Sequence, residues 1–249
     1  MSKEREVNNE NKLVMELVSA IRTLPGNNNR ERLGDFVNVG IVECAEEMIK
    51  VGWCVGYPGM HHKLVAGNPG DYDNAIKAYI NLVRIKEPFE DVLAAVHAQL
   101  ALDGTGKKNC QHFTPQKIAL EMFKTLGDDV HGDEFANVMD PTCGSGVTLL
   151  SACRLTEQNI LLKRQILGVD LDPLCAGMTA LQLMSNQMVH GKVIGSIEIQ
   201  CKDMIKEYMD HKPYVSCVRH EFLWLVPQEV LRLREAKTNT VVRSNKEAA

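Results

Sequence analysis

The chain has 249 residues, of which 45% are hydrophobic and 24% are charged, and its formal net charge is −4. This composition is typical of a soluble globular protein with one or two domains. No apolar run approaches the roughly 18 residues that a membrane helix requires, and the polar N-terminus is unlike a signal or transit peptide, so we expect a cytoplasmic location and no membrane contact.

Helices are predicted for most of the first 105 residues. Apolar residues recur there at helical spacing in four segments. The predicted helices cover residues 11–24, 30–51, 73–85 and 87–102, with Pro88 in the first turn of the last one. A stretch rich in Gly and Pro at 54–72 predicts a loop. The pattern therefore indicates a helical N-terminal domain over residues 1–105.

Strands alternate with helices after Gly106. Predicted strands lie at 136–140, 166–170 and 193–201, and predicted helices begin at Thr114-Pro115, Val147 and Pro173. This alternation predicts a parallel sheet in a Rossmann-like α/β domain over residues 106–236, followed by a flexible tail at 237–249. The remaining segment offers one more strand, at either 215–218 or 222–226, and one helix at 227–236. It is therefore open whether the sheet is complete.

The most informative local feature is the glycine turn, residues 140–146, which reads D-P-T-C-G-S-G between a predicted strand and a predicted helix. Glycines in such a turn let a ligand lie against bare backbone, and the helix N–H groups point at its negative end. This layout is typical of a nucleotide-like cofactor site at the carboxyl edge of an α/β sheet. The turn matches neither G-x-G-x-x-G nor the phosphate loop that ends in G-K-[ST].

Three aspartates fall at the carboxyl ends of three successive predicted strands: Asp140, Asp170 and Asp203. Such residues converge on one crevice of a parallel sheet. Asp170 is placed to accept from ribose hydroxyls, and Asp203 from an exocyclic adenine amine. Three carboxylates repel a phosphate-rich cofactor and attract a cationic amino-acid end, which favours S-adenosylmethionine over NAD. The alternative is that each aspartate only caps a helix or ends a strand.

No metal site is expected. The chain has eight cysteines, but no two stand at C-x-x-C spacing and no pair is followed by closely spaced histidines. Reduced, mostly buried thiols are therefore the better interpretation. The acidic net charge does not favour nucleic-acid binding, although a local basic patch is enough to contact DNA.

Three motifs in order resemble the adenine-N6 DNA methyltransferases, above all the modification subunits of type I restriction systems. They are Q-H-F-T-P at 111–115, the glycine turn, and G-V-D-L-D-P at 168–173. The resemblance implies a Rossmann-like methyltransferase sheet and methyl transfer from S-adenosylmethionine to adenine in DNA. The cofactor-binding residues that it implies are Phe113, Thr114, Pro115, Asp140, Pro141, Thr142, Gly144, Ser145, Gly146, Asp170 and Asp203.

The chain departs from this family at the catalytic loop. The family has [N/D/S]-P-P-[Y/F/W] after the fourth strand, where it holds the target amine and stacks on the flipped base. This chain contains no Pro-Pro, and the nearest candidate is H-K-P-Y at 211–214, which would make Pro213 and Tyr214 the catalytic residues.

Two hypotheses remain open. The chain is either a DNA adenine-N6 methyltransferase that acts with a separate DNA-reading subunit, or a catalytically degenerate module. Such a module would bind S-adenosylmethionine or a modification enzyme in an anti-restriction or regulatory role. The expected partners are DNA, contacted weakly or through another protein, and a specificity or modification subunit.

Overall fold

The computed structural model describes residues 3–57, 66–100, 113–126, 136–209, 221–228 and 232. Its helices are α1 (Lys3–Arg22), α2 (Asn29–Lys50), α3 (Asp73–Ile85), α4 (Leu93–Leu100), α5 (Gln116–Leu126), α6 (Val147–Leu155), α7 (Gln158–Leu161), α8 (Pro173–His190) and α9 (Met204–Met209), with a 3-10 helix at Pro69–Tyr72. Its strands are β1 (Trp53–Gly56), β2 (Ala136–Asp140), β3 (Arg164–Asp170), β4 (Ser196–Cys201) and β5 (Glu221–Pro227). Among these described residues, no helix has the length and hydrophobicity to cross a membrane.

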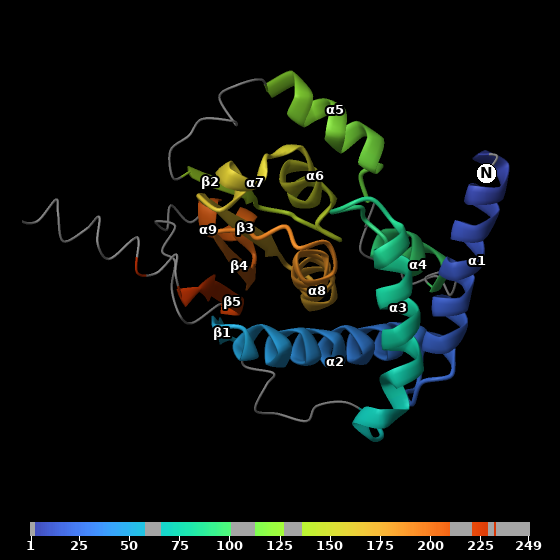
Figure 1. The fold of residues 1–249 in the computed structure, drawn as a ribbon. Helices are drawn as coiled ribbons and strands as arrows, with labels where there is room; N and C mark the ends of the chain where they lie inside the picture. The colour runs from blue at the N-terminus through green and yellow to red at the C-terminus, as the bar shows by residue number, and fades with distance from the viewer. Residues whose placement is uncertain are drawn as a thin grey trace, which may run out of the picture.

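The described strands form one sheet in the order β1-β5-β4-β3-β2 (Figure 1). β2, β3 and β4 are parallel, whereas β5 runs antiparallel to both β4 and β1. α8 packs against β3, β4 and β5, and α6 packs against β2 and β3. The α/β class and the helical N-terminal region are therefore as predicted. Because β2, β3 and β4 are parallel, their carboxyl ends share one edge of the sheet.

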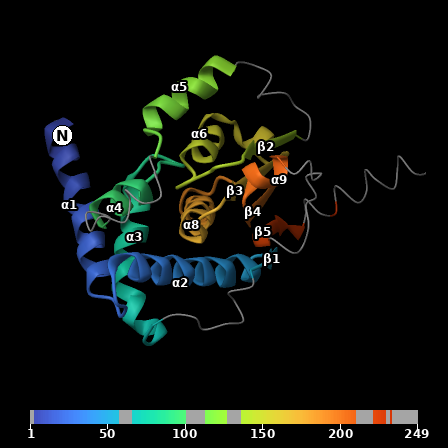
Figure 2. The same cartoon turned by 180° about the vertical axis from the view of Figure 1, so that it is seen from behind.

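One hydrophobic core joins the N-terminal helices to the sheet. α2 packs across α8 (Figures 1 and 2), and Gly40 permits this close approach, since an added Cβ would lie 2.9 Å from a methyl carbon of Leu181. Tyr79 of α3 packs edge-on against Phe36 and shares a hydrogen bond of 2.8 Å with Ser185 of α8. The helices of the first hundred residues are thus packed directly onto the element that supports the sheet.

The prediction of a loop from residue 54 is wrong at its start. Residues 53–56 form β1, which pairs with β5 in the register Trp53 to Pro227 and Gly56 to Trp224. The partner strand lies about 170 positions later in the chain, so the pairing is a tertiary effect that local Gly and Pro content does not reveal. The domain boundary at residue 105 stays a prediction, although β1 lies on its N-terminal side and belongs to the sheet.

The predicted helix at 87–102 is also partly wrong, because α4 begins only at Leu93 and Pro88 does not open it. Phe89 has a left-handed φ of 59°. Side-chain amides of α8 accept from backbone N–H groups of the segment ahead of α4: Asn186 accepts from Phe89 and Gln182 accepts from Val92. These side-chain acceptors satisfy backbone N–H groups that have no partner within a helix.

Other boundaries agree with the sequence. α3 and α8 have the predicted bounds, 73–85 and 173–190, and β5 confirms the strand at 222–226. The alternative strand at 215–218, the flexible tail at 237–249 and nearly all of the helix predicted at 227–236 lie outside the described residues.

Candidate functional site

The glycine turn leaves β2 at Asp140 and is fixed to β3 by backbone bonds. The Asp140 carboxylate accepts from the Thr142 N–H at 3.0 Å, and the Cys143 N–H donates to the Val169 carbonyl at 2.8 Å. The Gly146 N–H then returns to the Cys143 carbonyl at 2.7 Å. The backbone of the turn is thus held by its own hydrogen bonds and by a bond to the neighbouring strand, independently of any ligand.

Two positions of this turn require glycine. Gly144 and Gly146 have φ values of 56° and 95°, which other residues rarely adopt. A Cβ on Gly146 would lie 2.9 Å from the Thr179 hydroxyl oxygen and 3.2 Å from its Cα, and a Cβ on Gly144 would lie 3.2 Å from the Phe113 ring. The turn backbone therefore packs closely against α8 at Gly146 and against Phe113 at Gly144.

Asp170 ends β3 with its carboxylate held by two backbone donors. One oxygen accepts from the Gly144 N–H at 2.8 Å and the other from the Asp172 N–H at 2.9 Å. Burial raises the pKa of Asp170; the two N–H bonds lower it, and the charges of Asp172 and Asp140 raise it further. Each oxygen retains acceptor capacity, so the carboxylate is oriented to receive further donors such as ribose hydroxyls.

Asp203 lies at the same edge, directly after β4. The preceding residue, Lys202, donates its N–H to the Asp170 carbonyl at 3.0 Å, and Asp170 pairs with Cys201 in the β3–β4 register. One Asp203 oxygen accepts from the Lys206 N–H at 2.9 Å and so caps α9. We call the carboxyl ends of β2, β3 and β4, with their three aspartates, the acidic edge. The three aspartates lie at one edge of the sheet, as predicted, and Asp203 also has the local capping role that was the alternative.

The F-T-P segment, residues 113–115, lies against the glycine turn. Phe113 contacts His97 of α4 edge-on, with ring centroids 4.9 Å apart, and lies over Gly144. The Pro115 carbonyl accepts from Ile118 and so opens α5. Thr114 is exposed.

Pro141 and Thr142, the second and third residues of the glycine turn, are exposed. Ser145 differs from them, because its side chain is fully buried and its hydroxyl donates to Asp91 at 2.5 Å. The Ser145 side chain therefore faces the protein interior rather than the acidic edge.

Sequence reasoning missed several residues of this region. Arg30 of α2 forms an ion pair of 2.5 Å with Asp172, which in turn caps α8, and no local signal connects residues 142 positions apart. Leu171 is 69% exposed although it lies between the two aspartates of G-V-D-L-D-P. An apolar residue between two aspartates at a predicted strand end is visible in the sequence, and it could have identified Leu171 as a candidate site residue. Next to Asp172 lies a cavity of about 450 Å³, bounded by Arg30, Pro173 and other residues of α2 and α8.

The proposed catalytic residues Pro213 and Tyr214 lie outside the described residues. The same holds for most of the segment that follows α9. Within the parts of the chain that the structure describes, no group of three or more His, Cys, Asp or Glu side chains is arranged to hold a metal ion.

The comparison with known protein families agrees with the motifs. A family model described as N-6 DNA methylase matches residues 90–216, just over half of the chain, and this span contains the glycine turn, Asp170 and Asp203. A solved structure from Listeria monocytogenes, described as a class I S-adenosylmethionine-dependent methyltransferase, is similar with 13% identity and a TM-score of 0.40. The similarity covers 71% of this chain and 51% of that one, so the chain spans about half the length of its structural relative. No curated protein matches the sequence.

Proposed function

Because the chain belongs to the N-6 DNA methylase family, we propose that it uses S-adenosylmethionine to methylate the N6 amine of adenine in DNA. One observation carries the cofactor assignment: Gly144 presents bare backbone beside the Asp170 carboxylate, whose orientation is fixed by the Gly144 and Asp172 N–H groups. A positioned carboxylate next to a glycine turn suits a ligand with ribose hydroxyls.

The acidic edge fits the parts of S-adenosylmethionine in chain order. Asp140 and the glycine turn would hold the cationic amino-acid end, and Asp170 the ribose hydroxyls. The exposed Leu171 side chain would cover one face of the adenine, while Asp203 would accept from its amine. A dinucleotide pyrophosphate would instead meet negative charge at three successive strand ends.

Phe113 has a supporting role in this proposal. Its ring lies between Gly144 and His97, so it would close the turn from the side opposite α8. Thr114 and Pro115 follow it at the exposed start of α5. The F-T-P segment would therefore bound the cofactor site at its methionine end.

When bound, S-adenosylmethionine supplies an electrophilic methyl group on a sulfonium centre. The transfer is an in-line displacement, so the task of the protein is to hold the donor and bring the adenine amine onto its axis. For the first part we propose the glycine turn and the acidic edge. For the second we propose residues 211–214, with Tyr214 stacking on a flipped adenine and the Pro213 carbonyl accepting from its amine.

DNA recognition is proposed to involve a partner. The net charge of −4 gives the chain little general attraction to a polyanion, so we expect a specificity or modification subunit to supply most phosphate contacts. The proposed working unit is an assembly in the cytoplasm in which this chain provides the cofactor site.

Calorimetric titration with S-adenosylmethionine tests the cofactor assignment. We expect binding by the intact chain and a loss of about 100-fold in affinity for Asp170→Ala, because charged hydrogen bonds are each worth about 1.5–3 kcal/mol. Asp35→Ala, which removes an aspartate in α2 that accepts from the Ala66 N–H, is the matched control. Absence of binding, or equal affinity of the Asp170→Ala variant, would refute the proposal.

Methyl transfer is tested with labelled cofactor and unmethylated DNA, with and without a modification-system partner. Transfer that is lost in Tyr214→Ala, while cofactor affinity is unchanged, supports residues 211–214 as the catalytic loop. Cofactor binding without transfer under all these conditions would leave the degenerate binding module as the function.

A further inference from the structure

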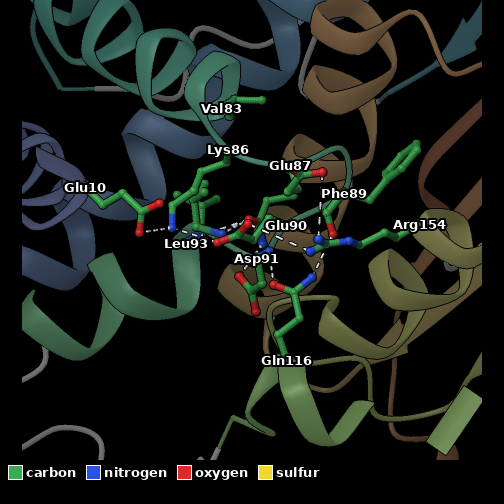
Figure 3. Close-up of polar contacts among 12 residues, drawn as sticks. Glu10, Val83, Lys86, Glu87, Phe89, Glu90, Asp91, Leu93, Gln116 and Arg154 are labelled. Atoms are coloured by element: carbon green, nitrogen blue, oxygen red, sulfur yellow. Dashed lines mark hydrogen bonds and ion pairs between the residues drawn. The ribbon is translucent and has the colours of Figure 1, made fainter. Parts of the chain in front are cut away.

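The loop between α3 and α4, residues 86–92, is tied to distant elements by side-chain amides; we call it the anchor loop (Figure 3). Gln116 of α5 accepts from the Asp91 N–H at 2.9 Å and donates to the Phe89 carbonyl at 3.0 Å. Asn186 of α8 accepts from the Phe89 N–H at 2.6 Å. Gln182 of α8 accepts from the Val92 N–H at 2.8 Å.

Ion pairs hold the outer side of the anchor loop. Lys86, whose side chain is 15% exposed, contacts Glu10 of α1 at 2.9 Å and Glu90 at 2.7 Å. Arg154 of α6 lies 3.9 Å from both Glu87 and Glu90 (Figure 3). With bonds to four helices, the loop is a fixed support rather than a free connection.

Asp91 directs its carboxylate from this support to the glycine turn. One oxygen accepts from the Ser145 hydroxyl at 2.5 Å, and the other accepts from the Gln182 amide at 2.9 Å and from the Ala94 N–H at 3.0 Å. Desolvation raises the pKa of the Asp91 carboxyl, and these donors oppose that effect. A carboxylate in such surroundings is retained only where its hydrogen bonds are satisfied.

Helix capping explains one of these contacts and not the others. The bond from the Ala94 N–H caps the start of α4, and a serine would serve for that. The other oxygen accepts from the Ser145 hydroxyl, a contact outside α4. Gln182 closes a triangle, because the same amide nitrogen that donates to Asp91 also donates to the Ser145 carbonyl at 2.8 Å.

Ser145 lies between Gly144 and Gly146, which both have positive φ. Contacts that hold Ser145 in place therefore also restrain the backbone of the glycine turn. The neighbouring Gly144 donates its N–H to Asp170, and its carbonyl accepts from the Thr179 hydroxyl at 3.0 Å. A shift of Ser145 would therefore move the N–H that orients the Asp170 carboxylate. One contact that opposes this shift comes from Asp91, 54 positions earlier in the chain, and Gln182 supplies the other.

We propose that Asp91 is a positioning residue of the cofactor site: through Ser145 and Gln182, it holds the glycine turn in the conformation that presents Gly144 and Asp170 to S-adenosylmethionine. The identity of the ligand in this inference rests on the proposed function. The effect of Asp91 on the glycine turn rests on the described contacts alone. It assigns a role in the methyltransferase site to the helical region that precedes it.

The decisive variant is Asp91→Ser, which keeps a capping oxygen for α4 but is too short to reach Ser145 and Gln182. We expect its Kd for S-adenosylmethionine to rise about tenfold, the loss that corresponds to about 1.4 kcal/mol. Asp91→Asn should restore most of the affinity, since its carbonyl can accept from Gln182 and Ala94 while its amide donates to Ser145. Affinities are compared at a temperature at which every variant is folded.

Two controls separate positioning from general stability. Asp35→Ser removes a partly buried aspartate that accepts from the Ala66 N–H, and its Kd should stay at the wild-type value. Ser145→Ala should raise the Kd, and combining it with Asp91→Ser should add little, because both changes remove the same contact. An unchanged Kd in folded Asp91→Ser, or an equal rise in Asp35→Ser, would overturn the proposal.

Hydrogen exchange in the ligand-free protein tests the inference without the cofactor. The Gly144 and Gly146 amides should exchange faster in Asp91→Ser than in wild type, and at the wild-type rate in Asp35→Ser. If wild type fails to bind S-adenosylmethionine, the proposed function falls and exchange alone decides whether Asp91 orders the turn. Unchanged exchange at both glycines would refute the positioning role.

Discussion

The two halves of the acidic edge are held in different ways. In the β2–β3 half, the glycine turn and Asp170 are bonded to each other and to α8, and Asp91 supports them from the N-terminal helical region. In the β4 half, within the described part of the chain, the Asp203 carboxylate accepts one hydrogen bond, from the Lys206 N–H three residues later. Long-range contacts define the first half except at Asp140, whose carboxylate accepts from the Thr142 N–H, and a local cap defines the second half.

This difference indicates how binding energy is divided along the edge. Groups that are fixed in the folded protein do not need to be ordered when a ligand binds, whereas a locally held side chain does. The β2–β3 half should therefore determine most of the affinity for the sugar and the amino-acid end. The β4 half should contribute less, and its effect should be confined to the base.

The largest effect is expected from Gly146→Ala. The substitution combines a φ of 95° with a Cβ 2.9 Å from the Thr179 hydroxyl, so we expect a loss of about 2–4 kcal/mol in the free energy of unfolding. Denaturant titration measures it. Gly34→Ala in α2, where no atom lies within 4 Å of the added Cβ, should instead raise the stability by up to about 1 kcal/mol. Equal effects at the two positions would contradict the close packing of the turn.

The comparison between halves is sharpest between Asp170→Ala and Asp203→Ala. We expect about 100-fold weaker cofactor binding for the first and about tenfold for the second, because the first removes the acceptor of the ribose hydroxyls and the second removes the acceptor of one amine hydrogen bond on a locally held side chain. Titration with adenosine, and with an adenosine analogue whose base lacks the amine, separates the contribution of Asp170 from that of Asp203. A larger loss at Asp203 than at Asp170 would reverse the proposed division.

A pH titration gives a third and smaller effect. Burial raises the pKa of Asp170, so its carboxyl takes up a proton at a higher pH than an exposed aspartate does. The protonated form is a weaker acceptor for ribose hydroxyls, and cofactor affinity should therefore fall as the pH is lowered through that raised pKa. Calorimetry across the acidic range measures the fall. Asp170→Asn should remove this part of the dependence, and its persistence there would assign it to another group.

Much of this site was predictable because its signals are local in sequence. The glycine turn, Asp170 and Asp203 lie at strand ends that periodicity alone identifies, and the bounds of α3 and α8 follow from their apolar spacing and from Pro173 at a helix start. Parallel strands then bring these ends to one edge without further information.

The remaining features depend on contacts between distant segments. The anchor loop resembles the start of a helix in sequence, but amides of Gln182 and Asn186, about 90 positions later, take its N–H groups. β1 exists because β5 supplies its partner. The inward orientation of Ser145 likewise depends on Asp91. No window of local sequence contains both members of any of these pairs.

The smallest effect is expected from Arg30→Ala, which tests whether the helical region acts on the edge by charge as well as by packing. Arg30 pairs with Asp172; the arginine side chain is 38% exposed and the aspartate side chain 8%, so water screens the pair only in part, and we expect it to contribute about 1 kcal/mol. Asp172 keeps its capping bond to the Leu174 N–H, so the start of α8 should persist. We therefore expect cofactor affinity within about threefold of wild type. A loss greater than that of Asp203→Ala would show that α2 supports the edge as strongly as the anchor loop does, and the contrast between the halves would then reflect the whole helical region rather than Asp91.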